Sequence, residues 1–191
     1  MVSEQLEKEL QAYEPVNGEE AGYRDAMIAL VGQGGDESLT RGHFEPGHFT
    51  ASSFVLSPDR ESLLMILHSK FNLWLQPGGH IDGGGESPVS AAKREVEEET
   101  GVAQENLSLI EHEGHAIFDI DVHPIPENLK KGEPAHAHYD LRFLFEAADD
   151  GVMAGSDAND AKWVKLDEIE TVQTDESVMR AVRKLRLLLG R

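Results

Sequence analysis

An α/β (α+β) fold is the class that the sequence predicts, because strand-like and helix-like segments alternate along a chain of 191 residues. Residues 49–56 and 62–68 are rich in apolar and β-branched residues, and the Ser-Pro-Asp-Arg turn between them is typical of a β-hairpin. Residues 88–100 begin with Pro88 after Ser87, a pair that is a helix N-terminal signal, and Gly101 follows them where a left-handed C-cap residue is needed. A chain of this length suits one main domain.

The segment before the hairpin predicts an N-terminal helical extension. Leu6 and Leu10 are four residues apart, so they indicate a short amphipathic helix with Ser3 as its N-cap. A second helix is expected over residues 19–31, where a glycine-rich stretch stops it, and a loop over residues 40–48 leads into the first strand.

Domain boundaries follow from this reading of the chain. We expect the helical extension to cover residues 1–47 and the main domain to cover residues 48–191.

Further strands and a closing helix are expected after the central helix. The strand pattern recurs over residues 107–110, 116–122, 139–146 and 162–164. The last helix places its apolar residues on one side, and these are Val178, Val182, Leu185 and Leu189.

Composition narrows the class of function. The formal net charge of -19 disfavours binding of nucleic acid, because a polyanion would be repelled. The chain has no cysteine, which removes thiolate nucleophiles, disulfides and Cys-ligated zinc. No apolar stretch approaches the length that crosses a bilayer, so no membrane association is expected and a cytoplasmic location is the default expectation.

Four glutamates lie within five positions near the end of the central helix. At about 100° per residue, Glu98 projects roughly 60° to one side of Glu95, and Glu99 roughly 40° to the other. Such a cluster opposes the helix dipole and repels itself, but its oxygens suit a hard divalent cation such as Mg²⁺ or Mn²⁺. Arg94 lies on the same side and can hold one carboxylate by a forked hydrogen bond. The alternative is a solvated acidic face.

The stretch from Leu75 to Val102 resembles the Nudix box, and this context favours the metal site. The family's pattern is Gly, five residues, Glu, seven residues, Arg-Glu, an aliphatic residue, any residue, Glu-Glu, any residue, Gly and an aliphatic residue. The match is complete from Glu86 onward, through Arg94, Glu95, Glu98, Glu99 and Gly101. Between Gly79 and Glu86 there are six residues in place of five, an insertion that a glycine-rich loop can absorb.

The resemblance implies a Nudix α/β/α sandwich with a central mixed β-sheet. It also implies a pyrophosphohydrolase that cleaves a diphosphate linkage with Mg²⁺ or Mn²⁺, by metal-ion catalysis. The metal ligands so implied are Glu95, Glu98 and Glu99, with Glu86 in support and the backbone carbonyl of Gly79.

The resemblance gives Arg94 the role of orienting the carboxylates. A general base often lies outside the box in this family, so Asp157 and Asp160, before the 162–164 strand, are candidates. Glu98 or Glu99 acting on a metal-bound water is the competing assignment.

Substrate contacts are expected from polar residues that alternate along one strand. His136, His138, Asp140 and Arg142 share a face, although a merely solvated face gives the same pattern. Arg142 suits a phosphate. Zinc at His136 and His138 is disfavoured, because the sequence reveals no third nitrogen ligand nearby.

The loop before the first strand offers further contacts for a phosphate, namely Arg41, His43 and His48. Trp74 suits stacking on a base, but a tryptophan between two leucines is more often partly buried structure.

The substrate class stays open between a nucleotide sugar, ADP-ribose and a nucleoside triphosphate. An RNA cap hydrolase is disfavoured by the charge. The rival class is a non-catalytic Nudix-fold module that binds nucleotides, and the intact glutamate set argues against it. The family suggests a homodimer, in which the N-terminal helices dock on their own domain or on a second subunit.

Overall fold

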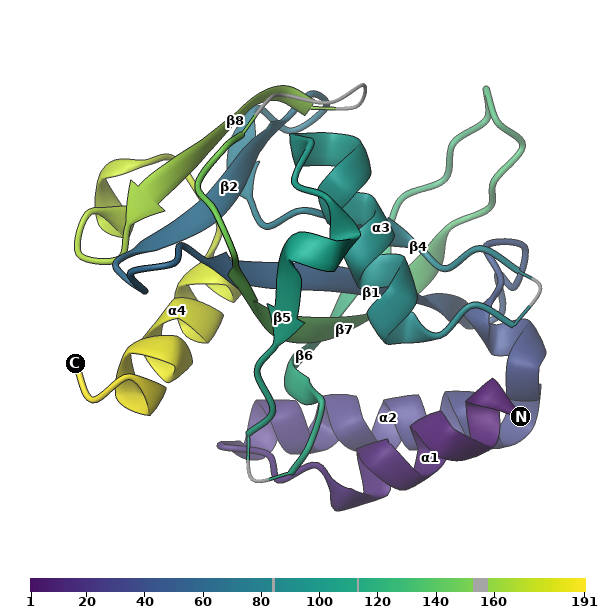
Figure 1. Ribbon diagram of the computed structural model, residues 1–191. Coiled ribbons are helices and arrows are strands. Elements are labelled where there is room, and N and C mark those ends of the chain that lie inside the picture. The colour runs from purple at the N-terminus through teal and green to yellow at the C-terminus, as the bar shows by residue number, and fades with distance from the viewer. Residues whose placement is uncertain (84, 113, 153–157) are drawn as a thin grey trace. The chain divides into compact units, whose positions relative to one another are not determined.

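The computed structural model describes residues 1–83, 85–112, 114–152 and 158–191, apart from the side chains of residues 158 and 159 (Figure 1). Among these residues it contains four α-helices and an eight-stranded sheet, so the expected mixed α/β fold is confirmed. The chain forms two compact units from segments that are distant in the sequence. Unit 1 contains residues 1–52, 79–92 and 111–143, and unit 2 contains residues 53–78, 93–110 and 144–191.

In unit 1, helix α1 (Val2–Ala12) packs on α2 (Gly18–Gly34), and α2 packs on strand β6 (Ile117–Ile125). Leu6 and Leu10 are buried in this packing, as their spacing predicts. The N-terminal helices therefore share one compact unit with part of the sheet.

The helix ends in this region differ in detail from the prediction. Ser3 is not the N-cap of α1: that position is Met1, while Ser3 lies inside the helix and donates its backbone N–H to Asp36 Oδ1 at 2.9 Å. Helix α2 begins after Asn17, whose side chain accepts the Glu20 N–H at 2.9 Å. It continues beyond residue 31 and ends at Gly34, and its C-cap residue Gly35 has a φ of 52° that suits glycine. A 3₁₀ turn (Gly35–Leu39) follows.

The strands of unit 1 make the sheet mixed. Strand β6 pairs antiparallel with β7 (His136–Ala147). Strand β1 (Gly47–Leu56) contacts β7 at two points, where Gly47 lies against Ala137 and Thr50 against Asp140. The difference in residue number is the same for both pairs, so the two strands run parallel. A Cβ on Gly47 would lie 1.9 Å from the Ala137 carbonyl oxygen, so this close approach requires glycine.

Helix α3 (Pro88–Thr100) has the predicted caps. The Ser87 hydroxyl accepts the Ser90 N–H at 3.2 Å, and Gly101 has a φ of 72° in the left-handed region. Val96 and Val102 are buried, as expected for the apolar positions of this segment.

Unit 2 contains the predicted hairpin. Strand β2 (Ser62–His68) pairs antiparallel with the end of β1, with β3 (Leu73–Leu75) and with β8 (Ala158–Lys165). Strand β5 (Leu107–Leu109), which follows a 3₁₀ turn (Gln104–Asn106), pairs with the end of β7.

The closing helix of unit 2, α4 (Glu176–Leu188), follows a 3₁₀ turn (Ile169–Thr171). The Asp175 carboxylate caps the helix by accepting the Val178 N–H at 2.9 Å. Val178, Val182 and Leu185 are buried as predicted, whereas Leu189 is the half-buried C-cap residue.

Both tryptophans of the chain lie in unit 2. Lys162 Nζ lies 3.9 Å from the centroid of the Trp74 ring, and Trp163 Nε1 donates to the Asp150 carbonyl oxygen at 2.8 Å. Trp74 is half-buried, in line with the structural reading of this residue.

Two strand boundaries differ from the sequence-based expectation. Strand β4 (Gly78–His80) forms inside the expected glycine-rich loop, because it pairs with β1. Strand β7 begins earlier, at His136, since the Ala137 N–H donates to the Pro46 carbonyl oxygen. None of the helices in the described part of the chain is long and apolar enough to cross a membrane.

Candidate functional site

The acidic end of α3 is organised by Arg94. Its Nη1 donates to Glu95 Oε1 at 2.9 Å and to Glu98 Oε1 at 3.3 Å. The Glu95 side chain is 15% exposed and that of Glu98 is 54% exposed, so this arginine holds one shielded and one accessible carboxylate on the same side of the helix. The contact that the sequence predicts between Arg94 and a carboxylate of the cluster is therefore present.

Glu99 is held differently from its two neighbours. It is buried, and its Oε2 accepts the backbone N–H of Gly78 at 2.9 Å. The last turn of α3 is thereby tied to the start of β4. Glu97 is exposed on another side of the helix, where Gln104 Nε2 donates to its Oε2 at 2.6 Å.

The donor atoms of Glu95, Glu98 and Glu99 fit a hard divalent cation by their chemistry, because all are carboxylate oxygens. In the described part of the chain these carboxylates are not gathered within 4.8 Å of one another.

Glu86 shapes the loop before α3, which belongs to unit 1. Its Oε2 accepts the backbone N–H of Asp82 at 2.7 Å. A cavity of about 290 Å³ adjoins this loop. Four carboxylates line it, those of Asp36, Glu37, Asp82 and Glu86, so an anion entering it requires a neutralising cation.

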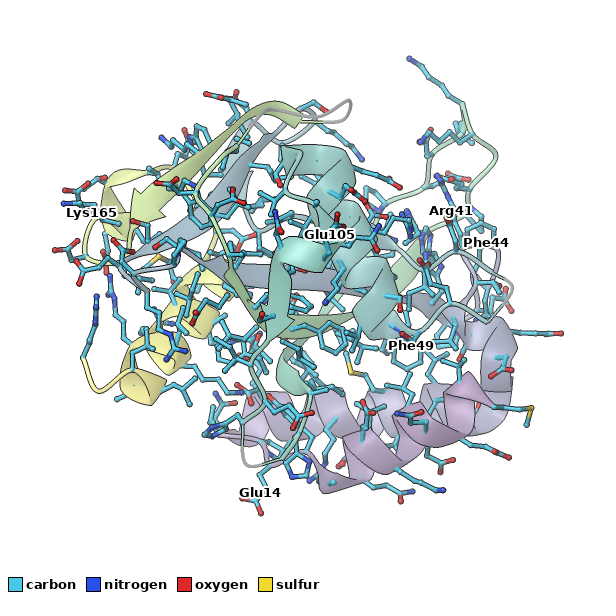
Figure 2. All side chains as sticks on the ribbon, in the orientation of Figure 1. Glu14, Arg41, Phe44, Phe49, Glu105 and Lys165 are labelled. Carbon is cyan, nitrogen blue, oxygen red and sulfur yellow. The ribbon has the colours of Figure 1, made fainter. Side chains whose placement is uncertain are left out.

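A second group of candidate ligands lies on the sheet of unit 1. His48, His136 and His138 place their ligand atoms within 4.8 Å of one another. His48 is fully buried, and its Nδ1–H donates to the His43 carbonyl oxygen at 3.1 Å. Phe44, labelled in Figure 2 in the loop before β1, has its ring centroid 5.1 Å from that of His136.

Two further imidazoles adjoin these three. The His80 ring lies 5.2 Å from the rings of both His48 and His138, and the His123 ring lies 5.5 Å from that of His138. Burial lowers the pKa of His80 to about 4, and neighbouring cationic groups add to the effect. Burial also lowers the pKa of His138 to about 2, and the surrounding imidazoles lower it further.

The pKa values of His48 and His123 are shifted in opposite directions. Burial lowers the pKa of His48, so its imidazole is also favoured in the neutral form. For His123, burial is the largest single effect and lowers the pKa. The hydrogen bond between Nδ1 and Asp121 Oδ2 at 3.0 Å and the negative charges of Asp140 and Asp121 together outweigh burial, so the pKa is raised. His48, His80 and His138 are therefore favoured in the neutral form, whereas the Asp121 carboxylate favours the charged form of His123.

Next to the histidines, a buried guanidinium lies among three carboxylates. Arg142 is 1% exposed; its Nε donates to Asp140 at 2.9 Å and its Nη1 to Asp119 at 3.2 Å, while Nη2 lies 3.4 Å from Asp121. Asp140 also accepts the hydroxyls of Thr50, at 3.0 Å, and Ser52, at 2.8 Å.

We call this surface the polar face, and it combines alternate residues of three strands. Its members are His48, Thr50, Ser52, Asp119, Asp121, His123, His136, His138, Asp140 and Arg142. The shared face predicted for the β7 residues is confirmed, but at Asp140 and Arg142 the face is buried and not solvated.

The remaining predicted residues lie in several places. Arg41 Nη2 donates to Glu133 Oε1 at 2.7 Å, and His43 Nδ1 pairs with the Gly47 carbonyl oxygen at 2.6 Å. Asp160 is exposed in β8, where its Oδ1 accepts the Ala161 N–H at 2.9 Å. Asp157 lies outside the described residues.

Sequence reasoning missed four members of the sites described above, namely His80, Asp119, Asp121 and His123. A signal for three of them was present, because Asp119, Asp121 and His123 alternate along β6 as the β7 residues do along theirs. The antiparallel register then pairs them with Arg142, Asp140 and His138.

The fold and the acidic helix together define a class of protein, and sequence comparison identifies it. The sequence profile of the NUDIX domain matches residues 46–184, so this chain belongs to the NUDIX family. The chain is also similar to a "Probable DHNTP pyrophosphohydrolase" of Lactococcus lactis subsp. cremoris, with 34% identity over 107 residues. That match covers 56% of this chain and 58% of the relative, so the chain spans less than two thirds of that protein.

Solved structures of this family share the fold. An Ap4A hydrolase of C. elegans aligns with a TM-score of 0.57 at 21% identity, over 74% of this chain and 97% of that chain. The E. coli dihydroneopterin triphosphate pyrophosphohydrolase aligns with a TM-score of 0.55 at 18% identity, over 71% and 92%. The NUDIX domain of Shewanella oneidensis NrtR, complexed with ADP ribose, aligns with a TM-score of 0.53 at 16% identity, over 74% and 87%. The expected Nudix fold is thus confirmed.

Proposed function

We propose that this protein is a pyrophosphohydrolase that cleaves a diphosphate linkage in a small nucleoside-diphosphate-like substrate, with Mg²⁺ or Mn²⁺ as cofactor. The observation that carries the proposal is the arrangement of α3, where Arg94 holds Glu95 and Glu98 while Gly78 holds Glu99. Family membership and the pyrophosphohydrolase relative support it.

The proposed metal ligands are the carboxylates of the box. Glu95, Glu98 and Glu99 would hold the cation, with Glu86 and the backbone carbonyl of Gly79 in support. A bound divalent cation supplies charge neutralisation at the phosphates and a lowered water pKa. Arg94 keeps Glu95 and Glu98 in one orientation, so that less side-chain freedom is lost when a cation binds.

The general base stays a proposal with two alternatives. Asp160 is exposed and accessible to a water molecule, and its role is consistent with a base outside the box. Glu98 or Glu99 acting on a metal-bound water is the competing assignment, and Glu98 is the more exposed of the two.

The sequence predicts substrate contacts at Arg41, His138, Asp140 and Arg142, and we propose direct contact for Arg41 and His138. Arg41 is the accessible cation of this set, with half of its side chain exposed. Asp140 and Arg142 are buried in ion pairs with each other, which favours a role in supporting the polar face over direct contact with a phosphate.

The substrate class is proposed from the names of similar proteins. Those names mention Ap4A, ADP ribose and dihydroneopterin triphosphate, which all contain a diphosphate linkage. A nucleotide sugar, ADP-ribose and a nucleoside triphosphate are therefore the first compounds to test. The boundary between residues 47 and 48, a homodimer and a cytoplasmic location also stay predictions.

The test is a hydrolysis assay with magnesium or manganese on nucleotide sugars, dinucleoside polyphosphates, ADP-ribose, dihydroneopterin triphosphate and nucleoside triphosphates. Wild type is compared with Glu98→Gln and Glu99→Gln. Glu97→Gln is the matched control, because Glu97 is on the same helix but bonds to Gln104. Turnover of one compound that falls at least about 100-fold in both variants and persists in the control supports the proposal.

Absence of turnover across all compounds, together with tight binding of one of them, would contradict hydrolysis. That result would favour the rival class, a NUDIX module that binds nucleotides without cleaving them.

A further inference from the structure

We propose that unit 1 carries a second metal site, at which His48, His136 and His138 bind one Zn²⁺ or a similar borderline transition-metal ion. Imidazole nitrogen suits such ions, whereas Mg²⁺ prefers the carboxylate oxygens of α3. The sequence offered only two candidate nitrogen ligands on one strand, and β1 supplies the third.

The geometry of the three ligands fits a single ion. Their ligand atoms lie within 4.8 Å of one another. Two nitrogens bound to one zinc ion at 2.0–2.1 Å with tetrahedral angles are about 3.3 Å apart, so modest side-chain rotations close the set. The ring centroids of His48 and His138 are 4.8 Å apart, and those of His48 and His136 are 5.0 Å apart.

The hydrogen bonds of two ligands fix which nitrogen is presented. His48 donates its Nδ1–H to the His43 carbonyl oxygen, and His136 donates its Nδ1–H to the Pro134 carbonyl oxygen at 2.7 Å. Each therefore offers the lone pair of Nε2. Metal-binding histidines commonly have such a carbonyl partner on the other nitrogen, because it sets the tautomer and the orientation of the ring.

His48 gives the strongest indication that a ligand is bound here. Its side chain is fully buried, and its Nε2 has no hydrogen-bond partner among the described residues. Buried polar atoms nearly always have a partner, so a lone pair in this position is explained by an ion at the centre of the group.

The charge state of the group is also suitable. Burial lowers the pKa of His48 and His138, and neutral imidazoles are the form that binds metal. Three protein ligands leave a fourth position of a tetrahedral ion for water or another exchangeable ligand.

The experiment is a Co²⁺ titration of the chelator-treated 191-residue protein, followed by visible absorbance, and then competition with Zn²⁺. Wild type is expected to bind one Co²⁺ with the intense bands of a tetrahedral nitrogen site, and Zn²⁺ should displace it. This readout needs no substrate, so the second site and the hydrolase proposal can fail independently.

Two asparagine variants test the ligands. His48→Asn and His136→Asn keep an N–H donor near the position of Nδ1 but remove Nε2, and each should weaken Zn²⁺ affinity by at least about 100-fold. His112→Asn is the matched control, because His112 is an exposed histidine of unit 1 that lies outside the group. Glu98→Gln should leave the Co²⁺ spectrum unchanged, which separates this site from α3.

Circular dichroism establishes that each variant is folded, and His136 serves where the fully buried His48 does not tolerate substitution. A wild-type protein without the tetrahedral spectrum would overturn the proposal. A spectrum that survives in both folded asparagine variants would also overturn it.

Discussion

The acidic end of α3 and the polar face of unit 1 are two groups of ionisable residues that are built in opposite ways. On α3, three carboxylates come from five consecutive residues, and Glu98 remains 54% exposed. On the polar face, side chains from three strands are buried together, and Arg142 pairs with three carboxylates, of which Asp119 and Asp121 come from the neighbouring strand β6. The helix therefore presents one accessible carboxylate, Glu98, beside two shielded ones, whereas the carboxylates of the sheet are all buried around one guanidinium. The exposed carboxylate suits the ion binding proposed for α3, whereas the buried Arg142 network links β1, β6 and β7.

Removal of the buried counter-charge should have the largest effect. Arg142→Met leaves three carboxylates in the interior without their cation, so we expect a loss of roughly 3–5 kcal/mol in the free energy of unfolding. Urea denaturation followed by circular dichroism measures it. The control is Arg60→Met, which breaks an exposed pair with Glu146 and should cost about 0–1 kcal/mol. Equal losses of unfolding free energy in both variants would show that the buried network of Arg142 is no more important for stability than the exposed pair of Arg60.

The close approach of β1 and β7 provides the next test. In Gly47→Ala the new methyl group meets the Ala137 carbonyl oxygen, and the strands must separate, at a cost of roughly 1–3 kcal/mol. Gly22→Ala is the control, because Gly22 lies inside α2 with open space around it and should be stabilised by up to about 1 kcal/mol. Thermal unfolding of both variants gives the sign of each effect. A stabilised Gly47→Ala would mean that the strands do not approach this closely.

On α3 the expected effect is on activity and not on stability. Arg94→Gln removes the cation that orients Glu95 and Glu98, so turnover of the substrate identified in the assay should fall about 10–100-fold. The free energy of unfolding should change little, because the carboxylates can relax toward solvent. Steady-state kinetics and urea denaturation on the same samples separate the two. Full activity in Arg94→Gln would show that the carboxylates need no orienting group.

The exposed ion pair between Arg186 and Glu170 should have the smallest effect on the free energy of unfolding, and this effect depends on pH. The Arg186 side chain holds the pKa of Glu170 at about 2, below its ordinary value of 4.5. The folded state therefore binds the proton less readily than the unfolded state. The stabilisation is complete above pH 4.5 and disappears as the pH falls through about 2.

We expect this pair to contribute less than about 1 kcal/mol, because half of the Glu170 side chain is exposed. Unfolding of wild type and Glu170→Gln should differ slightly near neutral pH and should converge in acid. A gap that widens in acid would show that the sign is wrong.

The sequence predicts correctly those features that depend on residues within one helix or one hairpin. The caps of α3, its buried valines and the contact of Arg94 with the carboxylates all follow from spacing along a single helix. The hairpin of β1 and β2 follows for the same reason, since its partners are adjacent in the chain.

The features that the sequence does not predict are contacts between residues on different strands, because they depend on which strands become neighbours. The third histidine of the group comes from β1, about ninety residues before the other two, and only the parallel pairing of β1 with β7 brings it near them. The burial of Arg142 has the same origin, because Asp119 and Asp121 reach it through the register of β6. The sequence predicts a loop where strand β4 forms, because two of its three residues are glycines, which have little strand preference.

The tryptophans and tyrosines are divided between the two units, so that tryptophan fluorescence reports on one unit alone. Both tryptophans, Trp74 and Trp163, lie in unit 2, whereas Tyr13, Tyr23 and Tyr139 all lie in unit 1. Excitation at the red edge of the absorption band therefore gives an emission signal from unit 2 alone. The ammonium group of Lys162 lies over the Trp74 ring, so separation of β8 from the Trp74 strand changes the environment of that fluorophore. A fluorescence trace of unfolding, set beside one from circular dichroism, shows whether the two units open together or one after the other.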